Sequence, residues 1–391
     1  MSASRSRDVP AFVVFGDDWG RRASTMQHLF SRIARDSTVI WVNSIGHREP
    51  GLSDIRRAWH KIRAMTRFDE GVPVSTGLRE SAQAPQFLVE PRVLPWHSNR
   101  FVAAFNRWSL KRDIERAVRD AGLRDYVMVT GSPPSANVIG ECGERASIYF
   151  CMDDFLVLPG TSPRMLEPLE RELLRRVDAV VATAQRLVAI KVCATGRGYH
   201  LPQGVNYEHF STRRAIPPEL RDLPRPIVGF AGGVGAAVDL PTLHAVSSAM
   251  PGASVVLVGP VTLPRESLAA PNIHVLGPRS YAELPAYVQS FDVGIIPYVE
   301  NDWTHSVDPL KLLEYLAAGV PVVSSPLPEV MKYRTAVTTA TLGDDFARAV
   351  VATAAGRGGA RGADAQAVAA QHTWSRRAEQ FLDIVADVSQ S

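Results

Sequence analysis

Short runs of consecutive apolar residues alternate with amphipathic stretches along the 391 residues of the chain. A continuous apolar run of four to six residues is typical of a strand that is buried on both faces of a parallel sheet. Such runs occupy residues 11–15, 38–42, 126–130, 147–150 and 178–183, and then 227–231, 254–258, 274–276, 293–296 and 320–325. Helical patterns lie between many of them. The chain is therefore predicted to be an α/β protein built from two arrays of βα units.

A polar, proline-rich stretch at residues 204–225 separates the two arrays. A stretch of this composition between two such arrays is typical of an interdomain linker. The chain is also long enough to give each array a substantial core of its own. We therefore predict an N-terminal domain at residues 1–208 and a second domain at residues 209–373.

The stretch from Ser306 to Gly319 is the most informative part of the sequence. Pro309 suits the first turn of a helix, and Gly319 suits its end. Lys311 and Glu314 are three residues apart and therefore share a face of that helix. The helix N-terminus and Lys311 would attract an anion, while Glu314 could accept hydrogen bonds from sugar hydroxyls, as a phosphate joined to a ribose requires. An ordinary amphipathic helix with a surface Lys–Glu pair would show the same pattern.

Glycine-containing turns follow the first strand of each array. The first turn ends in Gly20, Arg21 and Arg22 and lacks the GxGxxG fingerprint, which argues against a nicotinamide or flavin cofactor. The two arginines could face a diphosphate or could be the solvated start of a helix. In the second turn, Gly232 and Gly233 would let backbone N–H groups approach a phosphate.

Polar residues follow two further strands of the first array. Ser132 comes after the strand at 126–130, and Asp153 and Asp154 come after the strand at 147–150. Ligands of parallel α/β sheets bind at the carboxyl ends of strands, so these residues are site candidates. Adjacent carboxylates on an extended segment point in opposite directions, which makes them a poor catalytic pair, although one could bind a hydroxyl. A metal site would need more ligands than this pattern offers.

Composition and charge bear on the cellular compartment of the protein and on the kind of partner that it binds. No apolar run reaches the ~20 residues of a membrane span, and the N-terminus has no signal-peptide pattern. The three cysteines have no metal-site spacing, which favours a reducing cytoplasm. Residues 1–208 hold 29 Lys and Arg against 23 Asp and Glu, whereas the remainder holds 14 against 17. The first half therefore favours an anionic partner.

Residues 54–68 predict a basic amphipathic helix with five Lys and Arg residues and Trp59 on its apolar face. This pattern suits the anionic surface of a membrane, and a helix packed on its own domain with a solvated basic face would also show it. No nucleic-acid-binding motif accompanies it. We expect a cytoplasmic protein that is peripheral at the inner face of the plasma membrane.

Several motifs resemble those of a known family. They occupy residues 229–233, 277–285, 291–298 and, most specifically, 308–323. Together they resemble the retaining, family 4-like nucleotide-sugar glycosyltransferases of GT-B type, including the teichuronic acid and other cell-surface polysaccharide enzymes. The resemblance implies two Rossmann-like domains that face a central cleft, with a C-terminal helix at residues 374–391 returning to the N-terminal domain.

The resemblance also implies roles for individual residues. The catalytic set would be Lys311, which meets the donor diphosphate, Glu314, which binds the ribose hydroxyls, and Arg21. The donor side would comprise Gly232, Gly233, Gly277, Arg279, Ser306, Pro309, Leu310, Lys311 and Glu314. The acceptor side would comprise Gly20, Arg22, Ser132, Asp153 and Asp154. The donor would be a nucleotide diphosphate sugar and the acceptor a glycan or lipid-linked sugar, with no metal and no further cofactor.

The sequence departs from the family at three places. Ser306 stands where the family has the first of two glutamates, residues 232–239 hold no Arg or Lys, and Ser132 replaces a histidine. No catalytic base is visible, although retention with attack on the leaving-group side lets the departing phosphate take the acceptor's proton. The departures leave open a catalytically degenerate sugar-nucleotide-binding or scaffold protein, and a sugar-nucleotide epimerase is a third reading.

Overall fold

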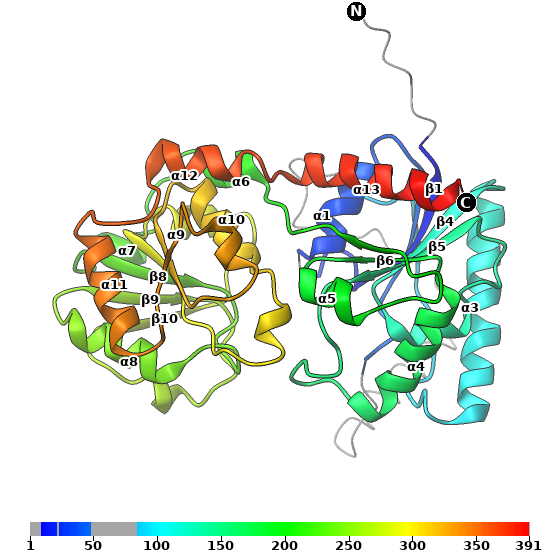
Figure 1. Cartoon of the computed structure of the whole chain (residues 1–391), viewed down its shortest axis with the longest axis horizontal. Coiled ribbons are helices and arrows are strands. Elements are labelled where there is room, and N and C mark those ends of the chain that lie inside the picture. The colour runs from blue at the N-terminus through cyan, green and yellow to red at the C-terminus, as the bar shows by residue number, and fades with distance from the viewer. Residues whose placement is uncertain (1–8, 22, 48–83, 391) are drawn as a thin grey trace, which may run out of the picture. The chain divides into compact units, whose positions relative to one another are not determined.

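The computed structural model describes residues 9–21, 23–47 and 84–390, which form two compact units. Unit 1 is Met1–Leu201 with Ala378–Ser391, and unit 2 is Pro202–Arg377. Each unit is built around one parallel sheet with helices on its faces (Figure 1). The predicted α/β class is confirmed. The boundaries fall at 201/202 and 377/378, where the sequence placed them at 208/209 and 373/374.

The sheet of unit 1 has seven strands in the order β3-β2-β1-β4-β5-β6-β7. Val14 of β1 pairs with Trp41 of β2 on one side and with Val129 of β4 on the other. The strand order reverses between β1 and β4, which is where ligands of such sheets bind. The strands are β1 (Ala11–Phe15), β2 (Val39–Val42), β3 (Phe87–Val89), β4 (Tyr126–Thr130), β5 (Ala146–Cys151), β6 (Ala179–Ala182) and β7 (Gly198–His200).

Helices cover both faces of this sheet because alternate residues of its buried strands point to opposite sides. Phe12 of β1 faces Phe30 and Phe381, whose ring centroids lie 5.7 Å apart, while Val13 contributes to the core on the other face. The C-terminal helix thus packs on unit 1, as predicted. The helices are α1 (Thr25–Ile33), α3 (Arg100–Asp120), α4 (Pro163–Arg176), α5 (Gln185–Ile190) and α13 (Trp374–Ser389).

The sheet of unit 2 has six strands in the order β10-β9-β8-β11-β12-β13, with the reversal between β8 and β11. Its strands are β8 (Ile227–Ala231), β9 (Ser254–Val258), β10 (Ile273–Gly277), β11 (Val293–Ile296), β12 (Val322–Ser324) and β13 (Thr338–Thr339). Its helices are α6 (Tyr207–Ser211), α7 (Pro218–Arg221), α8 (Leu240–Ala249), α9 (Leu284–Val288), α10 (Leu310–Ala317), α11 (Asp344–Ala354) and α12 (Gly362–Ala369).

The prediction that residues 204–225 form a linker is wrong for most of that stretch. Phe210 of α6 and Leu220 of α7 are fully buried in the core of unit 2. His209 Nε2 lies 2.8 Å from the Tyr281 carbonyl oxygen and its ring stacks on Tyr281. The stretch is therefore part of unit 2, and its helices are too short to show a clear apolar period.

Within the described residues, no helix combines the length and the apolar character needed to cross a bilayer. The predicted basic helix at residues 54–68 lies outside the described residues, as does Arg22.

Candidate functional site

Helix α10 carries the predicted Lys–Glu pair and lies at the carboxyl end of the central strand of unit 2. Pro309 is its N-terminal capping residue, one position earlier than the first turn, and Gly319 ends it with φ 76°. The Tyr315 hydroxyl accepts a hydrogen bond of 2.7 Å from the Ala231 amide at the end of β8. Burial of the leucine and tyrosine face of α10 and this bond fix the helix beside the β8 strand end.

Lys311 lies directly against the glycine turn that follows β8. Gly232 has φ 144°, and a β-carbon there would lie 2.9 Å from Lys311 Cε and 3.2 Å from its Nζ. The ammonium bonds to the Tyr298 hydroxyl and lies 5.1 Å from the Phe230 ring centroid. The turn and the cation, predicted separately, thus form one site at the reversal of strand order.

At the carboxyl edge of the unit 2 sheet, the backbone requires glycine at residues 232 and 259, and Gly233 leaves open space. A β-carbon at Gly259, after β9, would lie 2.0 Å from the Gly232 carbonyl oxygen, so the two turns are in backbone contact. A β-carbon at Gly233 would meet no heavy atom within 4 Å. Phosphate oxygens could therefore lie between the open side of the glycine turn and the first turn of α10, which carries Lys311.

Glu314 is a carboxylate that the fold of unit 2 does not use. Its side chain is half-buried, and among the described residues the structure gives it no hydrogen-bond partner. Loss of hydration raises its pKa to about 7, against the opposing effect of Lys311. A half-buried acid kept without partners, one turn from a cation, is typical of a ligand-binding group.

Ser306 and Asp308 precede α10 and are engaged in local structure. Ser306 is fully buried, and its hydroxyl donates to the Asp302 carbonyl oxygen at 3.3 Å. Asp308 Oδ2 accepts a hydrogen bond of 2.8 Å from the Gln203 amide. The serine at the position where the resemblance places a glutamate is therefore buried in the segment before α10, and Leu310 is half-buried in the first turn.

Gly277 and Arg279 lie at the end of β10. The Gly277 carbonyl oxygen accepts a bond of 2.9 Å from the Gly259 amide, which joins this strand end to the glycine turns. Arg279 donates to the Tyr287 hydroxyl at 2.7 Å and pairs with Glu219 at 3.0 Å. The guanidinium is thus held by partners inside unit 2.

In unit 1, the predicted Gly20 and Arg21 occupy the turn after β1. Gly20 has φ 77°, and its amide donates to Gln27 Oε1 of α1 at 3.1 Å. Arg21 is exposed and pairs with Asp18 at 3.2 Å. The glycine thus shapes the turn, and the arginine is a solvated cation at the start of a helix.

Ser132 has a partner that the sequence did not reveal. Its hydroxyl lies 3.0 Å from His47 Nε2, and the His47 ring stacks on Phe155 at 4.9 Å. Burial, and then the neighbouring His97, lower the pKa of His47 to about 4. A neutral histidine and a serine hydroxyl therefore meet at the carboxyl edge of the unit 1 sheet, from the ends of β2 and β4. Only the fold brings these positions together, because 85 residues separate them.

Asp154, which the sequence placed on the acceptor side, belongs to an ion-pair network inside unit 1. Lys191 Nζ, 5% exposed, lies 2.8 Å from Asp154 Oδ1 and 2.7 Å from Glu170 Oε2. The Tyr149 hydroxyl donates to Glu170 at 2.7 Å. Asp154 is committed to balancing a buried ammonium, while its neighbour Asp153 is half-buried.

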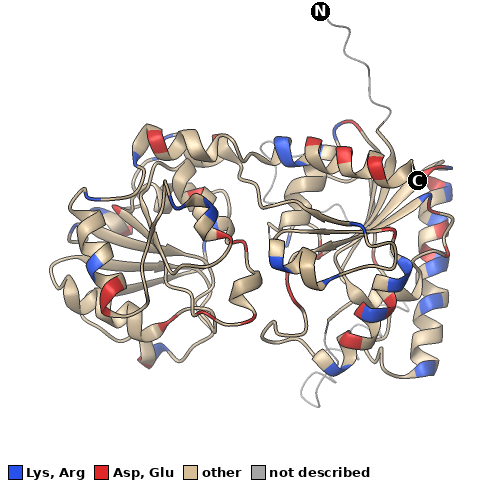
Figure 2. Ribbon diagram, viewed as in Figure 1, with Lys and Arg blue, Asp and Glu red and all other residues tan. Residues whose placement is uncertain are grey.

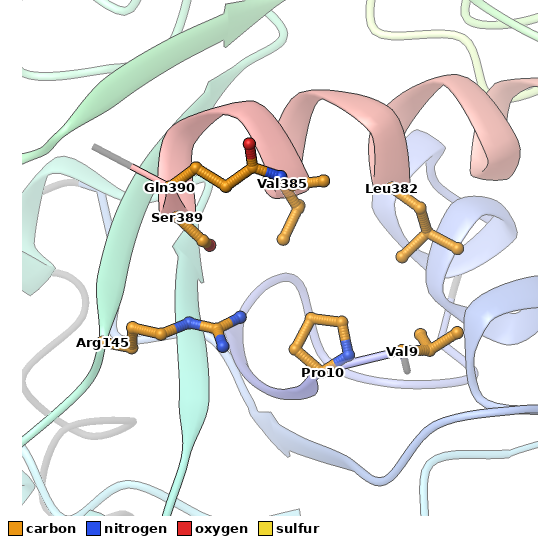
Figure 3. A pocket seen from close by; sticks show the side chains of 8 residues that line it. Val9, Pro10, Arg145, Leu382, Val385, Ser389 and Gln390 are labelled. Atoms are coloured by element: carbon orange, nitrogen blue, oxygen red, sulfur yellow. The ribbon is translucent and has the colours of Figure 1, made fainter. Parts of the chain in front are cut away.

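A cavity of about 300 Å³ lies at the opposite edge of the unit 1 sheet (Figure 3). Pro10 precedes β1 and Arg145 precedes β5, so the cavity borders the amino ends of the strands, against α13. Its other lining side chains include Leu382 and Val385, and Arg145 is paired with Asp125 at 2.7 Å. Its position at the amino ends of the strands does not suit a nucleotide, since ligands of such sheets bind at the carboxyl ends.

Among the residues that the structure describes, no three His, Cys, Asp or Glu side chains cluster in a way that could hold a metal ion.

The fold is of the GT-B class. The chain is similar over 97% of its length to sucrose-phosphate synthase of Thermosynechococcus elongatus, with a TM-score of 0.67, 14% identity and 99% of that chain covered. It is similar over 96% of its length to HepE of Anabaena, in a complex with UDP and glucose, with a TM-score of 0.63, 13% identity and 100% of that chain covered.

Residues 225–356, which lie in unit 2, match the family model described as glycosyl transferases group 1. The chain is also 31% identical over 180 residues to TuaH of Bacillus subtilis (strain 168), a protein assigned as a glycosyltransferase of teichuronic acid biosynthesis. This similarity covers 43% of the present chain and 45% of TuaH, about half the length of that relative.

Proposed function

We propose that the protein is a glycosyltransferase that takes a sugar from a nucleotide diphosphate sugar bound at the carboxyl edge of unit 2. The observation that carries the proposal is the meeting of Lys311, the Gly232 turn and the unpartnered carboxyl of Glu314 at the reversal of strand order. These groups lie in the glycosyl transferases group 1 domain. A GT-B neighbour of the same fold, HepE, is described in complex with UDP and glucose, which supports a donor of this class.

Each group has a chemical role in the proposed reaction. Glu314 accepts hydrogen bonds from ribose hydroxyls, and these bonds are strongest when its carboxyl is ionised. When the bond between the sugar and the diphosphate breaks, negative charge develops on the leaving oxygen. Lys311, the positive end of α10 and the amides of the glycine turn stabilise that charge. In this proposal no metal and no further cofactor takes part.

The stereochemistry is part of the proposal and rests on the resemblance of the sequence to retaining enzymes. We propose retention, with the acceptor hydroxyl attacking on the side of the leaving group and its proton passing to the departing phosphate. Catalysis then depends on positioning and charge stabilisation.

The acceptor is proposed to be a glycan or a lipid-linked sugar of a cell-surface polysaccharide, by analogy with TuaH. Ser132, paired with His47, is the acceptor-side candidate that the structure supports best, since it lies at the strand reversal of unit 1. The protein would act in the cytoplasm, at the inner face of the plasma membrane.

A second candidate is a degenerate GT-B protein that binds sugar nucleotide without transfer. It is favoured by Ser306, whose hydroxyl is turned to a backbone carbonyl, and by the absence of Arg and Lys in residues 232–239. A sugar-nucleotide epimerase remains the third candidate.

Release of nucleotide from labelled nucleotide diphosphate sugars, with and without membrane extract as the source of acceptor, separates these functions. A transferase releases nucleotide in an acceptor-dependent way, and Glu314→Ala abolishes the release. Donor binding without release identifies the degenerate protein, and a changed sugar without acceptor identifies the epimerase. Unchanged release by Glu314→Ala contradicts the assigned site.

A further inference from the structure

Helix α3 of unit 1 has a second apolar face that points away from the sheet. Its buried residues, which include Asn106, Leu110 and Ile114, face the core. On the other side Phe101, Phe105 and Trp108 recur at helical spacing and are 78%, 41% and 57% exposed. We call these three residues the α3 aromatic face. Exposed aromatic side chains gathered on one helix mark a surface that meets something apolar.

Cations flank this face. Arg112 lies over the Trp108 ring at 5.3 Å and Arg100 over the Phe101 ring at 5.7 Å. Neither of these arginines has a carboxylate partner among the described residues. The sequence between Glu90 and Asp113 contains no acidic residue.

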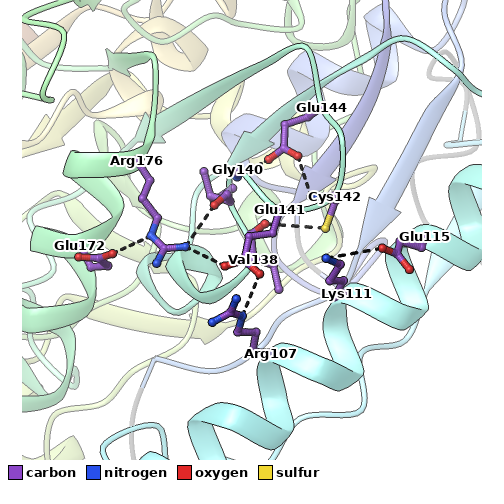
Figure 4. Close-up of polar contacts among 11 residues, drawn as sticks. Arg107, Lys111, Glu115, Val138, Gly140, Glu141, Cys142, Glu144, Glu172 and Arg176 are labelled. Atoms are coloured by element: carbon purple, nitrogen blue, oxygen red, sulfur yellow. Dashed lines mark hydrogen bonds and ion pairs between the residues drawn. The ribbon is translucent and has the colours of Figure 1, made fainter.

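Two further cations of α3, Arg107 and Lys111, are paired with carboxylates. Arg107 pairs with Glu141 at 2.8 Å, and Lys111 lies 3.9 Å from Glu115 (Figure 4). Glu141 also accepts from Arg176 of α4, so this flank is locked to unit 1. Acidic side chains of α3 are confined to its C-terminal half, and the half that bears the aromatic residues carries only basic ones (Figure 2).

We propose that the α3 aromatic face is a docking surface for an anionic lipid bilayer. Trp and Phe insert at the level of the headgroups, where a partly hydrated apolar ring is stable. Arg100 and Arg112, which lie beside the rings, can contact lipid phosphates. No carboxylate is paired with these arginines that would repel the phosphates. A face that mixes large apolar rings with unpaired cations matches lipid chemistry better than the apolar surface of a second copy of the chain. The inference does not depend on the proposed transferase activity, since no residue of unit 2 enters it.

Co-sedimentation of the full chain with lipid vesicles tests the proposal. The chain is expected to bind vesicles that contain phosphatidylglycerol, to bind phosphatidylcholine vesicles weakly, and to lose binding as salt increases. The double variant Phe101→Ala, Trp108→Ala and the double variant Arg100→Gln, Arg112→Gln are each expected to lower the partition coefficient roughly tenfold. Val192→Ala is the matched control, because Val192 is a 61% exposed apolar residue elsewhere in unit 1, and it should bind as the parent does.

Three results would overturn the proposal: no binding of the parent chain to anionic vesicles, equal binding by the parent and both double variants, or equal loss in Val192→Ala. Analytical ultracentrifugation tests the alternative that a second copy of the chain covers the α3 aromatic face. A dimer of the parent that the aromatic double variant abolishes would make this face a contact between copies and would also overturn the proposal. Thermal unfolding of each variant confirms that the fold is intact, and nucleotide binding by unit 2 should be unchanged throughout.

Discussion

Lys311 lies so close to Gly232 that a β-carbon at residue 232 would come within 2.9 Å of the lysine Cε. The contact joins the turn after β8 to the first turn of α10, two segments that are far apart in the sequence. Because residues 232–239 contain no Arg or Lys, Lys311 supplies to this turn the positive charge that the turn itself lacks.

Alanine substitutions at Gly232 and Gly233 should have different effects on stability, because a β-carbon is strained at the first position and unhindered at the second. Gly232→Ala places a β-carbon at φ 144° against Lys311, and we expect it to lower the free energy of unfolding by about 1–3 kcal/mol. Gly233→Ala meets no atom within 4 Å and should change that free energy by less than about 0.5 kcal/mol. Chemical denaturation of both variants makes the comparison. Equal losses of stability would show that the Lys311 contact does not constrain the turn.

The ionised carboxylate of Glu314 should lower the stability of the folded chain while it favours ligand binding. Its pKa of about 7 in the folded chain exceeds the ordinary 4.5, so the unfolded chain loses its proton first as the pH rises. The parent therefore loses stability between pH 4.5 and 7 and regains none above pH 7. Glu314→Gln should be more stable than the parent by roughly 1–3 kcal/mol at pH 8 and equal to it below pH 4.5.

Binding should change in the opposite direction. Affinity of the parent for a nucleotide diphosphate sugar, whose diphosphate does not titrate near neutral pH, should rise as the pH passes through about 7, and Glu314→Gln should bind about tenfold more weakly at pH 8 with no such rise. Glu300→Gln, at an exposed carboxylate of the same unit, is the control and should match the parent in both assays. A Gln variant that is destabilised, or that keeps the pH-dependent rise, would contradict this role for Glu314.

Ser132 and His47 should affect the acceptor and not the donor. Ser132→Ala removes the hydroxyl 3.0 Å from His47, and we expect kcat/KM for the acceptor to fall about tenfold. His47→Phe keeps a ring against Phe155 and should give a similar loss. Because the pKa of His47 is about 4, the activity should show no titration of this group between pH 6 and 8. Loss of nucleotide affinity in either variant would argue against an acceptor-side role.

The buried ion pairs of Lys191 should be a structural feature of unit 1. Lys191→Met leaves Asp154 and Glu170 without their cation in a site from which water is largely excluded. We expect the free energy of unfolding to fall by about 3–5 kcal/mol. Lys111→Met removes an exposed pair at 3.9 Å and should cost at most about 1 kcal/mol. If Lys191→Met unfolds like the Lys111 control, the network is not what fixes the segment after β5.

The sequence was sufficient where a feature depends on neighbours in the chain. The strand at 126–130 is β4 as predicted, because a continuous apolar run already contains the information that both faces are buried. Helix α10 was predicted from its own apolar spacing and from Gly319. Helices α6 and α7 were missed, since four or five residues give no period, and the prolines around them suggested a linker.

The site shows the same division. Gly232 and Lys311 could each be proposed from local sequence, but their contact could not. Tyr298 belongs to the motif at residues 291–298, but its bond to Lys311 had no local signal. His47, which bonds to Ser132, had none either, because its partner comes from another strand end. Asp154 was assigned to the acceptor side from its local sequence, which did not reveal its ion pair. Its position after a strand suggested a ligand, while its partner Lys191 lies 37 residues further on.

Titration calorimetry with nucleoside diphosphates, beginning with UDP, tests the central claim most directly. The parent chain should bind one nucleotide without added metal, and Lys311→Ala and Glu314→Ala should each weaken binding at least about tenfold. Tyr199→Phe, which removes a hydroxyl that bonds to Asp387 in unit 1, should bind as the parent does. Absence of binding to every nucleoside diphosphate, or full affinity in Lys311→Ala, would contradict a donor site at the carboxyl edge of unit 2.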